Sequence, residues 1–197
     1  VNVLWKEGDS EADVYVNQLI EEVEFAYEYG INTVVMHVTG GDTPPPMCSF
    51  GIKNIEKVLN VCEKHNITLC LENLRRLDYL GFLFKNLDSD KLRFCFDSGH
   101  ANYMTQNVDD FPWDIFGSKL HCLHINDNNG LKDQHLIPFN GNIKWEKLMK
   151  VLFGFNKQLE LTLEVRSSAE MRSQYSEERY LELCINSLAR LHKILEK

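Results

Sequence analysis

The sequence lacks the features that mark several large classes of protein. It has no run of about 18 apolar residues, the length that a helix needs to span a membrane. None of its six cysteines forms a C-x-x-C pair, which favours buried thiols in a reducing cytoplasm over a disulfide framework. A basic stripe for nucleic-acid phosphates is also missing, and the net charge is -8. Membrane proteins, disulfide scaffolds and most nucleic-acid binders are therefore disfavoured.

The rest of the composition is that of a globular protein. The chain has 197 residues, of which 44% are hydrophobic and 25% charged. This length predicts a single domain, residues 1–197. The sequence starts at Val1 instead of a methionine, within polar, loop-like residues. We interpret it as a fragment that has lost its N-terminal part.

Short apolar runs alternate with segments of helical periodicity along the chain. Such alternation predicts a parallel sheet covered by helices. The predicted strands are residues 31–38, 67–72, 92–97, 120–125 and 159–165. The predicted helices are residues 9–29 with Ser10 as cap, 50–65, 77–87, 108–116, 145–155 and 175–196, the last with Tyr180, Leu181, Cys184, Leu188, Leu191 and Ile194 on its apolar side.

Each predicted strand ends in a side chain that can bind a metal. These residues follow one another at intervals of 25 to 40 residues and are His37, Glu72, Asp97, His124 and Glu164. One such residue alone is commonly a helix cap or a buried core histidine. Five together, on the face where parallel strands end, indicate an active site at the mouth of a (β/α)8 barrel.

The residues two positions before these strand-end residues lie on the same face of each strand as the strand-end residues do. All of them are small or medium in size. They are Val35, Cys70, Cys95, Cys122 and Thr162, and we interpret the cysteines as packing residues. Three carboxylates and one imidazole, Glu72, Asp97, Glu164 and His124, suit Mn²⁺, Mg²⁺ or Co²⁺, with Zn²⁺ as an alternative. Four further residues are candidates for binding the substrate, for binding further metals or for contacting the metal ligands from outside. They are His37, His100, Asp133 and His135.

The strand ends and the loops after them give five longer stretches, VVMHVTGG, LCLENL, FCFDSGH, LHINDNNGLKDQHLIPFNGNIKW and LTLEV. In this order they resemble the xylose isomerase-like TIM-barrel superfamily, in particular its sugar phosphate isomerase/epimerase branch. The resemblance implies that Glu72, Asp97, His124 and Glu164 hold a divalent metal. It implies that Glu72 and Glu164 also move a proton at the carbon next to a sugar carbonyl, with the metal stabilising the enediolate. His100 is the implied substrate contact.

One departure from the epimerase pattern keeps a second function open. The epimerases carry an arginine shortly after the histidine that matches His124, whereas this chain has Asp133 and His135. An Asp-x-His there resembles endonuclease IV, a DNA-repair enzyme with a multinuclear zinc site. The alternative is therefore an AP endonuclease. It is disfavoured because the loops are poor in the basic residues that grip phosphates.

Length is the second departure. Family barrels reach roughly 250 residues, so the five strands match the fourth to the eighth, and the barrel is expected to be truncated at its N-terminus. Residues 31–38 and 159–165 then form exposed edges, which favours a homo-oligomer or a truncated, non-catalytic assembly protein as a third reading. The favoured partner is a small sugar or polyol in cytoplasmic carbohydrate metabolism, next to Phe139 and Trp145.

Overall fold

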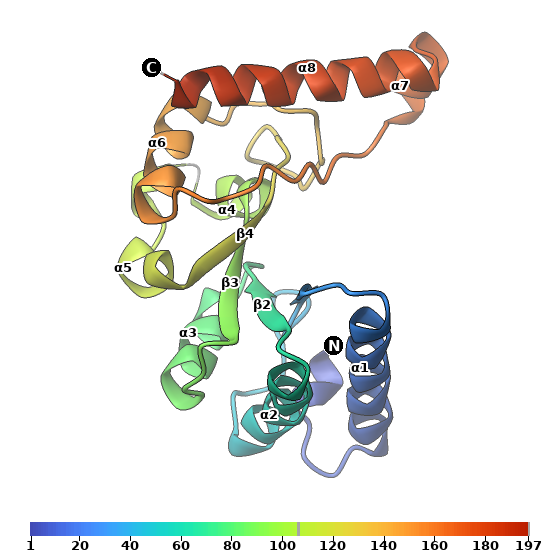
Figure 1. Cartoon of the computed structure of the whole chain (residues 1–197), viewed down its shortest axis with the longest axis vertical. Helices are drawn as coiled ribbons and strands as arrows, with labels where there is room; N and C mark the ends of the chain where they lie inside the picture. The colour runs from blue at the N-terminus through green and yellow to red at the C-terminus, as the bar shows by residue number, and fades with distance from the viewer. Residues whose placement is uncertain (106, 197) are drawn as a thin grey trace. The chain divides into compact units, whose positions relative to one another are not determined.

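The computed structural model describes residues 1–105 and 107–196, and within them the chain divides into two compact units, Val1–Cys95 and Phe96–Lys197 (Figure 1). The four described strands form one sheet in the order β1-β2-β3-β4. Unit 1 contains η1 (Asn2–Trp5), α1 (Ser10–Glu28), β1 (Thr33–Met36), α2 (Ser49–Lys64), β2 (Thr68–Glu72), α3 (Leu77–Asn86) and most of β3 (Leu92–Asp97). The single domain predicted for residues 1–197 stays a prediction.

The strands of unit 1 pair in parallel, as their apolar composition predicts. Thr33 pairs with Thr68 in the β1–β2 ladder, and Glu72 pairs with Cys95 in the β2–β3 ladder. Every residue of β2 is buried, including Thr68 and Glu72 at its ends, as is typical of a strand in a parallel sheet that is covered on both faces. β1 is shorter than the predicted strand 31–38. Ile31, the first residue of the predicted strand, lies before β1 and is exposed.

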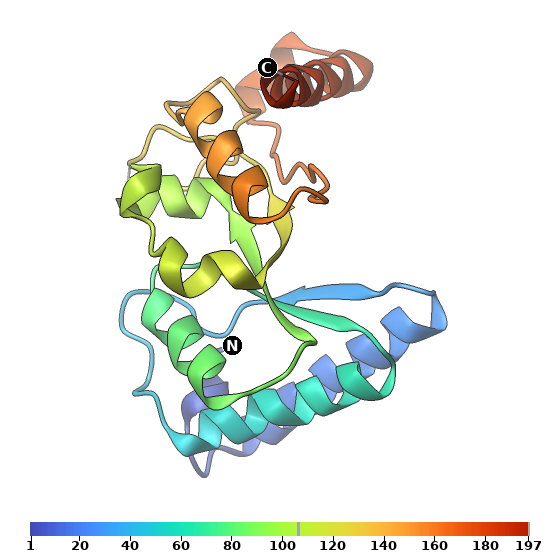
Figure 2. The same cartoon turned by 60° about the vertical axis from the view of Figure 1, so that its left-hand side comes forward.

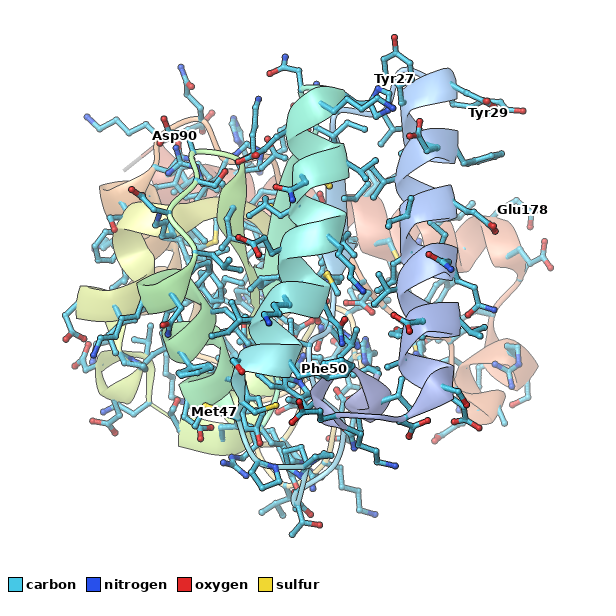
Figure 3. All side chains as sticks on the ribbon, turned by 90° about the horizontal axis from the view of Figure 1, so that it is seen from below. Tyr27, Tyr29, Met47, Phe50, Asp90 and Glu178 are labelled. Carbon is cyan, nitrogen blue, oxygen red and sulfur yellow. The ribbon has the colours of Figure 1, made fainter. Side chains whose placement is uncertain are left out.

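Helices α1 and α2 of unit 1 run side by side in the same direction, as successive βα units require (Figures 1 and 2). Figure 3 shows Tyr27 and Tyr29 at the end of α1 and Phe50 at the opposite end, where α2 begins. The cap of α1 is Asp9 and not the predicted Ser10, because the Asp9 side chain accepts the backbone N–H of Glu11 at 3.0 Å.

Two core residues of unit 1 show how closely it is packed. The indole N–H of Trp5 donates to the backbone oxygen of Val38 at 2.6 Å, and a Cβ on Gly51 would lie 2.1 Å from the Trp5 ring.

Burial raises the pKa of the Cys62 thiol to about 12, so this cysteine behaves as an apolar side chain. Of the three cysteines predicted to be packing residues, Cys70 and Cys95 are buried and Cys122 is half-buried, and all six cysteines are reduced thiols.

Unit 2 carries the remaining elements. They are α4 (Ser98–Thr105), η2 (Val108–Asp110), α5 (Trp113–Phe116), η3 (Gly117–Lys119), β4 (Leu120–His124), α6 (Trp145–Phe155), α7 (Ala169–Gln174) and α8 (Glu177–Leu195). The predicted helix 108–116 is therefore two short pieces, and α4 was not predicted. The predicted helix 175–196 begins two residues later, after a break that follows α7.

The predicted strand 159–165 is wrong in extent. Within the described residues it forms one parallel bridge, Ile125 with Leu163, through hydrogen bonds from Ile125 N to Thr162 O and from Glu164 N to Ile125 O. A single bridge still fixes the backbone of Glu164 beside the end of β4. The described helices include none that is both long and apolar enough for a membrane span.

The buried face of α8 differs from the predicted apolar side at one residue. Leu181 is 59% exposed, whereas Cys184 and Leu191 are buried, and Tyr180, Leu188 and Ile194 are half-buried as predicted. Ser187 is buried on the same face although it was not predicted there. The Ser187 hydroxyl is accommodated because it donates to the backbone oxygen of Cys184 at 2.7 Å.

Candidate metal centre

Asp97 ends β3 and is completely buried in unit 2. Its Oδ1 accepts the backbone N–H of His100 at 2.6 Å, and its Oδ2 accepts the side-chain amide of Asn126 at 2.8 Å. A buried carboxylate is costly unless such donors surround it. These two donors fix the orientation of the Asp97 carboxylate from the neighbouring helix and from the loop after β4.

The start of α4 and the loop after β4 are joined by further short contacts. The Ser98 hydroxyl accepts the backbone N–H of Asn126 at 3.0 Å and donates to the Asn126 backbone oxygen at 2.7 Å. The Asn128 amide donates to the Gly99 oxygen at 2.7 Å. A Cβ on Gly99 would lie 1.9 Å from Asn126 Oδ1, so only glycine permits this approach.

His124 and Glu164 meet beside Asp97. The imidazole Nδ1 of His124, at the end of β4, lies 3.0 Å from Glu164 Oε2. Asp97, His124 and Glu164 each offer one ligand atom, and these atoms lie within 4.8 Å of one another. Two carboxylates and an imidazole that converge in this way form a donor set suited to a divalent cation.

A second cluster in unit 2 consists of His100, Asp133 and His135, whose ligand atoms also lie within 4.8 Å of one another. Asp133 Oδ2 lies 3.2 Å from His135 Nε2 and 3.6 Å from His100 Nε2. The nearby imidazole of His100 lowers the pKa of Asp133 most, and the charge of His135 also lowers it, although partial burial opposes this. The structure thus brings together the three residues that the sequence left ambiguous.

His135 contacts Glu164 with one ring nitrogen and Asp133 with the other. His135 is 2% exposed and its Nδ1 lies 2.8 Å from the backbone oxygen of Glu164, which can only accept a hydrogen bond. Nδ1 therefore carries the proton in a neutral ring, and the lone pair of Nε2 faces the Asp133 carboxylate. Two facing lone pairs repel unless Nε2 is also protonated or a cation lies between the groups.

Asp127 organises the loop that carries Asp133 and His135 of this cluster. It is fully buried, and its carboxylate accepts four hydrogen bonds of 2.9 to 3.2 Å. The donors are the backbone N–H groups of Asn128, Phe139 and Ile143 and the indole N–H of Trp145. Its backbone also pairs in both directions with Leu136, the residue after His135. Asp127 therefore holds both ends of the loop.

Asn126, Asp127 and Asn128 were not predicted as site residues. Their signal was a run of short polar side chains directly after an apolar strand, which turns out to be fully buried. Trp145, predicted near the substrate, is 3% exposed and donates to Asp127. Its observed contact is therefore with the loop that positions the second cluster.

His37 and Glu72 lie in unit 1. Glu72 ends β2 and is 3% exposed, and its Oε2 lies 3.2 Å from Nε2 of His37, which follows β1 directly. The two predicted strand-end residues of this unit are thus adjacent. The role of Glu72 as a metal ligand, and of every other predicted site residue, stays a prediction.

Comparison with known proteins identifies relatives that match most of the chain. Residues 4–184 match the family described as xylose isomerase-like TIM barrel. An uncharacterized protein of Sinorhizobium fredii, y4fM, is 26% identical over 82% of this chain, and the match covers 56% of that protein. The chain therefore spans little more than half the length of this curated relative.

Two solved structures are similar to the chain in fold. One is D-psicose 3-epimerase with D-tagatose, from Clostridium cellulolyticum H10, with a TM-score of 0.80 and 14% identity; the match covers 98% of this chain and 74% of the epimerase chain. The other is the IOLI protein with a binding zinc atom, with a TM-score of 0.74 and 15% identity; the match covers 94% of this chain and 72% of the IOLI chain. These likenesses confirm the predicted α/β fold of the TIM-barrel type.

Proposed function

Because this chain belongs to the xylose isomerase-like TIM-barrel family, we propose that it is part of a divalent-metal-dependent isomerase or epimerase. The proposed substrate is a small sugar or sugar phosphate, and the reaction moves a proton at the carbon next to a carbonyl. The observation that carries the proposal is the convergence of Asp97, His124 and Glu164. Similar folds include a sugar epimerase, which supports this class of reaction.

The proposed ligands of the metal are Glu72, Asp97, His124 and Glu164. Carboxylate-rich sets favour Mn²⁺, Mg²⁺ or Co²⁺, while Zn²⁺ is the alternative that the zinc-bound IOLI structure supports. When bound, such a cation supplies positive charge beside the substrate oxygens and stabilises negative charge that develops there. Asn126 keeps Asp97 oriented toward the site, since its amide holds Asp97 Oδ2.

Glu72 and Glu164 are the proposed proton carriers. A carboxylate can accept a proton from the substrate carbon, and a second carboxylate on the other side can return one. His124 restrains Glu164 through the 3.0 Å contact, and His37 restrains Glu72 through the 3.2 Å contact. Restrained carboxylates lose less conformational freedom when the substrate binds, which favours proton transfer.

His100, Asp133 and His135 are proposed to bind a second divalent cation. The convergence of one ligand atom from each of these three side chains within 4.8 Å supports this assignment. The cluster also favours a second candidate function, an AP endonuclease with a multinuclear zinc site. The net charge of -8 opposes that candidate, because binding to a DNA backbone relies on basic side chains.

Metal analysis of paired variants tests the proposal. The protein is stripped with a chelator, reloaded with Mn²⁺ or Zn²⁺ and examined by elemental analysis. Glu164→Gln is expected to weaken metal binding by about 10-fold or more, whereas Glu160→Gln, an exposed position just upstream, is expected to bind as wild type. Equal affinities of the two variants would contradict the assignment of Glu164. Zinc-dependent cleavage of abasic DNA would favour the endonuclease instead.

A further inference from the structure

Unit 2 contains an open cavity of about 580 Å³ whose lining is strongly basic. Its charged residues are Lys144, Lys147, Arg190, Lys193 and one acidic residue, Glu146. They surround the aromatic rings of Phe139 and Trp145. A volume of this size is within the range of small-molecule pockets, roughly 300 to 1,000 Å³. The net positive lining contrasts with a chain whose net charge is -8.

The aromatic floor of the cavity is held in place by the loop after β4. Phe139 has a left-handed backbone, with φ of 75°, which is uncommon for an aromatic residue. It is retained because its backbone N–H donates to Asp127 at 2.9 Å, while the Trp145 indole binds the same carboxylate oxygen at 2.9 Å. The two rings consequently lie with centroids 5.9 Å apart.

Arg190 is positioned on this floor. Its guanidinium carbon lies 3.7 Å from the centroid of the Phe139 ring, a cation–π contact that orients the side chain. Ion pairs do not neutralise Arg190, Lys144 or Lys193 within residues 1–105 and 107–196, although Lys147 pairs with Asp109. Lys193 lies in the last turn of α8, where positive charge also stabilises the helix. That effect accounts for the charge of Lys193 but not for the convergence of Lys144 and Lys147, at the start of α6, with Arg190 of α8.

We propose that this cavity binds a small, multiply charged phosphate compound, such as a phosphorylated metabolite. The oriented guanidinium can donate two parallel hydrogen bonds to a phosphate group, and the lysines add charge around it. The proposal goes beyond the isomerase function, since its basic residues belong to neither metal-binding cluster. It describes a second ligand site on unit 2, between the start of α6 and the end of α8.

Calorimetry with inorganic pyrophosphate tests this site. The protein is first stripped of divalent metals, so that pyrophosphate cannot bind through them, and is titrated at low ionic strength, where charges are least screened. Wild type is expected to show saturable binding. The variant R190Q/K193Q is expected to bind about 10-fold more weakly, which corresponds to about 1.4 kcal/mol.

The matched control is K150Q/R179Q, which removes the same charge from exposed positions of α6 and α8 outside the cavity. It is expected to stay within about twofold of wild type, because the site depends on local contacts more than on net charge. Absence of saturable binding to wild type, or equal weakening in both variants, would overturn the proposal. Citrate that binds as tightly as pyrophosphate would overturn the preference for phosphate.

Discussion

The imidazole Nδ1 of His135 lies 2.8 Å from the backbone oxygen of Glu164. This contact determines which ring nitrogen is left for other partners, because a carbonyl oxygen cannot donate a proton. It also connects the two clusters of unit 2, since Glu164 belongs to one and His135 to the other. The left-handed backbone of His135, with φ of 49°, is the local conformation in which this contact forms.

Replacement of His135 by Asn tests the second cluster. Asn tolerates a left-handed backbone, and its amide N–H can replace Nδ1–H toward Glu164, so the fold is expected to persist. The nitrogen that faces Asp133 is lost. We expect H135N to bind one zinc ion fewer per chain than wild type at saturation, as measured by elemental analysis. An unchanged stoichiometry would show that the cluster holds no cation.

Asp133 should titrate at unusually low pH in the metal-free protein. Its pKa is lowered mainly by His100, so its ionised form contributes stability above its ordinary pKa, near 3.8. That contribution is lost as the pH falls through the lower folded value. Carboxyl NMR titration of H100Q should show the pKa moving back up, whereas H192Q, on the exposed side of α8, should leave it unchanged. An identical Asp133 titration in wild type and H100Q would contradict this assignment.

Asp127→Ala should destabilise unit 2 strongly. The change leaves two buried and two partly buried donors without their acceptor, and each buried donor costs about 1 to 3 kcal/mol. We expect the free energy of unfolding to fall by about 3 kcal/mol or more, measured by denaturant unfolding. Asp114→Ala, an exposed position of α5, should change it by less than about 0.5 kcal/mol. Similar losses for both would show that the Asp127 contacts contribute little.

Gly99→Ala should disturb the metal site through Asn126. The added Cβ would lie 1.9 Å from Asn126 Oδ1, which forces the amide away from Asp97. Loss of an outer contact to a metal ligand typically weakens metal binding by about 10- to 100-fold. Gly154→Ala is the control, because a Cβ there meets nothing within 4 Å. Titration with Mn²⁺ that gives wild-type affinity for G99A would contradict the proposed support of Asp97.

The sequence predicted the elements whose apolar pattern is strong. Residues 92–97 and 145–155 were predicted with the bounds that β3 and α6 have. α4 was not predicted because it buries only the small residues Ser98, Gly99 and Ala101, which give no helical apolar pattern. The alternating residues 159–165 resemble a strand, but alternation does not show how many backbone pairs a neighbour provides.

The same limit applies to the site. Strand-end positions indicated His124 and Glu164 because parallel strands bring their ends to one face. The role of Asp127 was not predictable, since its four donors come from loop residues up to Trp145 that only the folded loop brings together. Nor could the sequence show that His135 faces both Asp133 and Glu164, because this depends on its left-handed backbone.

Proton exchange tests the proposed chemistry most directly. The protein is loaded with Mn²⁺ and incubated in D₂O with a panel of ketoses, and deuterium at the carbon next to the carbonyl is followed by NMR. We expect wild type and E160Q to incorporate deuterium into at least one ketose, and E164Q to lose about 100-fold or more in rate, the scale of general base catalysis. Metal-loaded wild type that exchanges no proton on any ketose would contradict the proposed function.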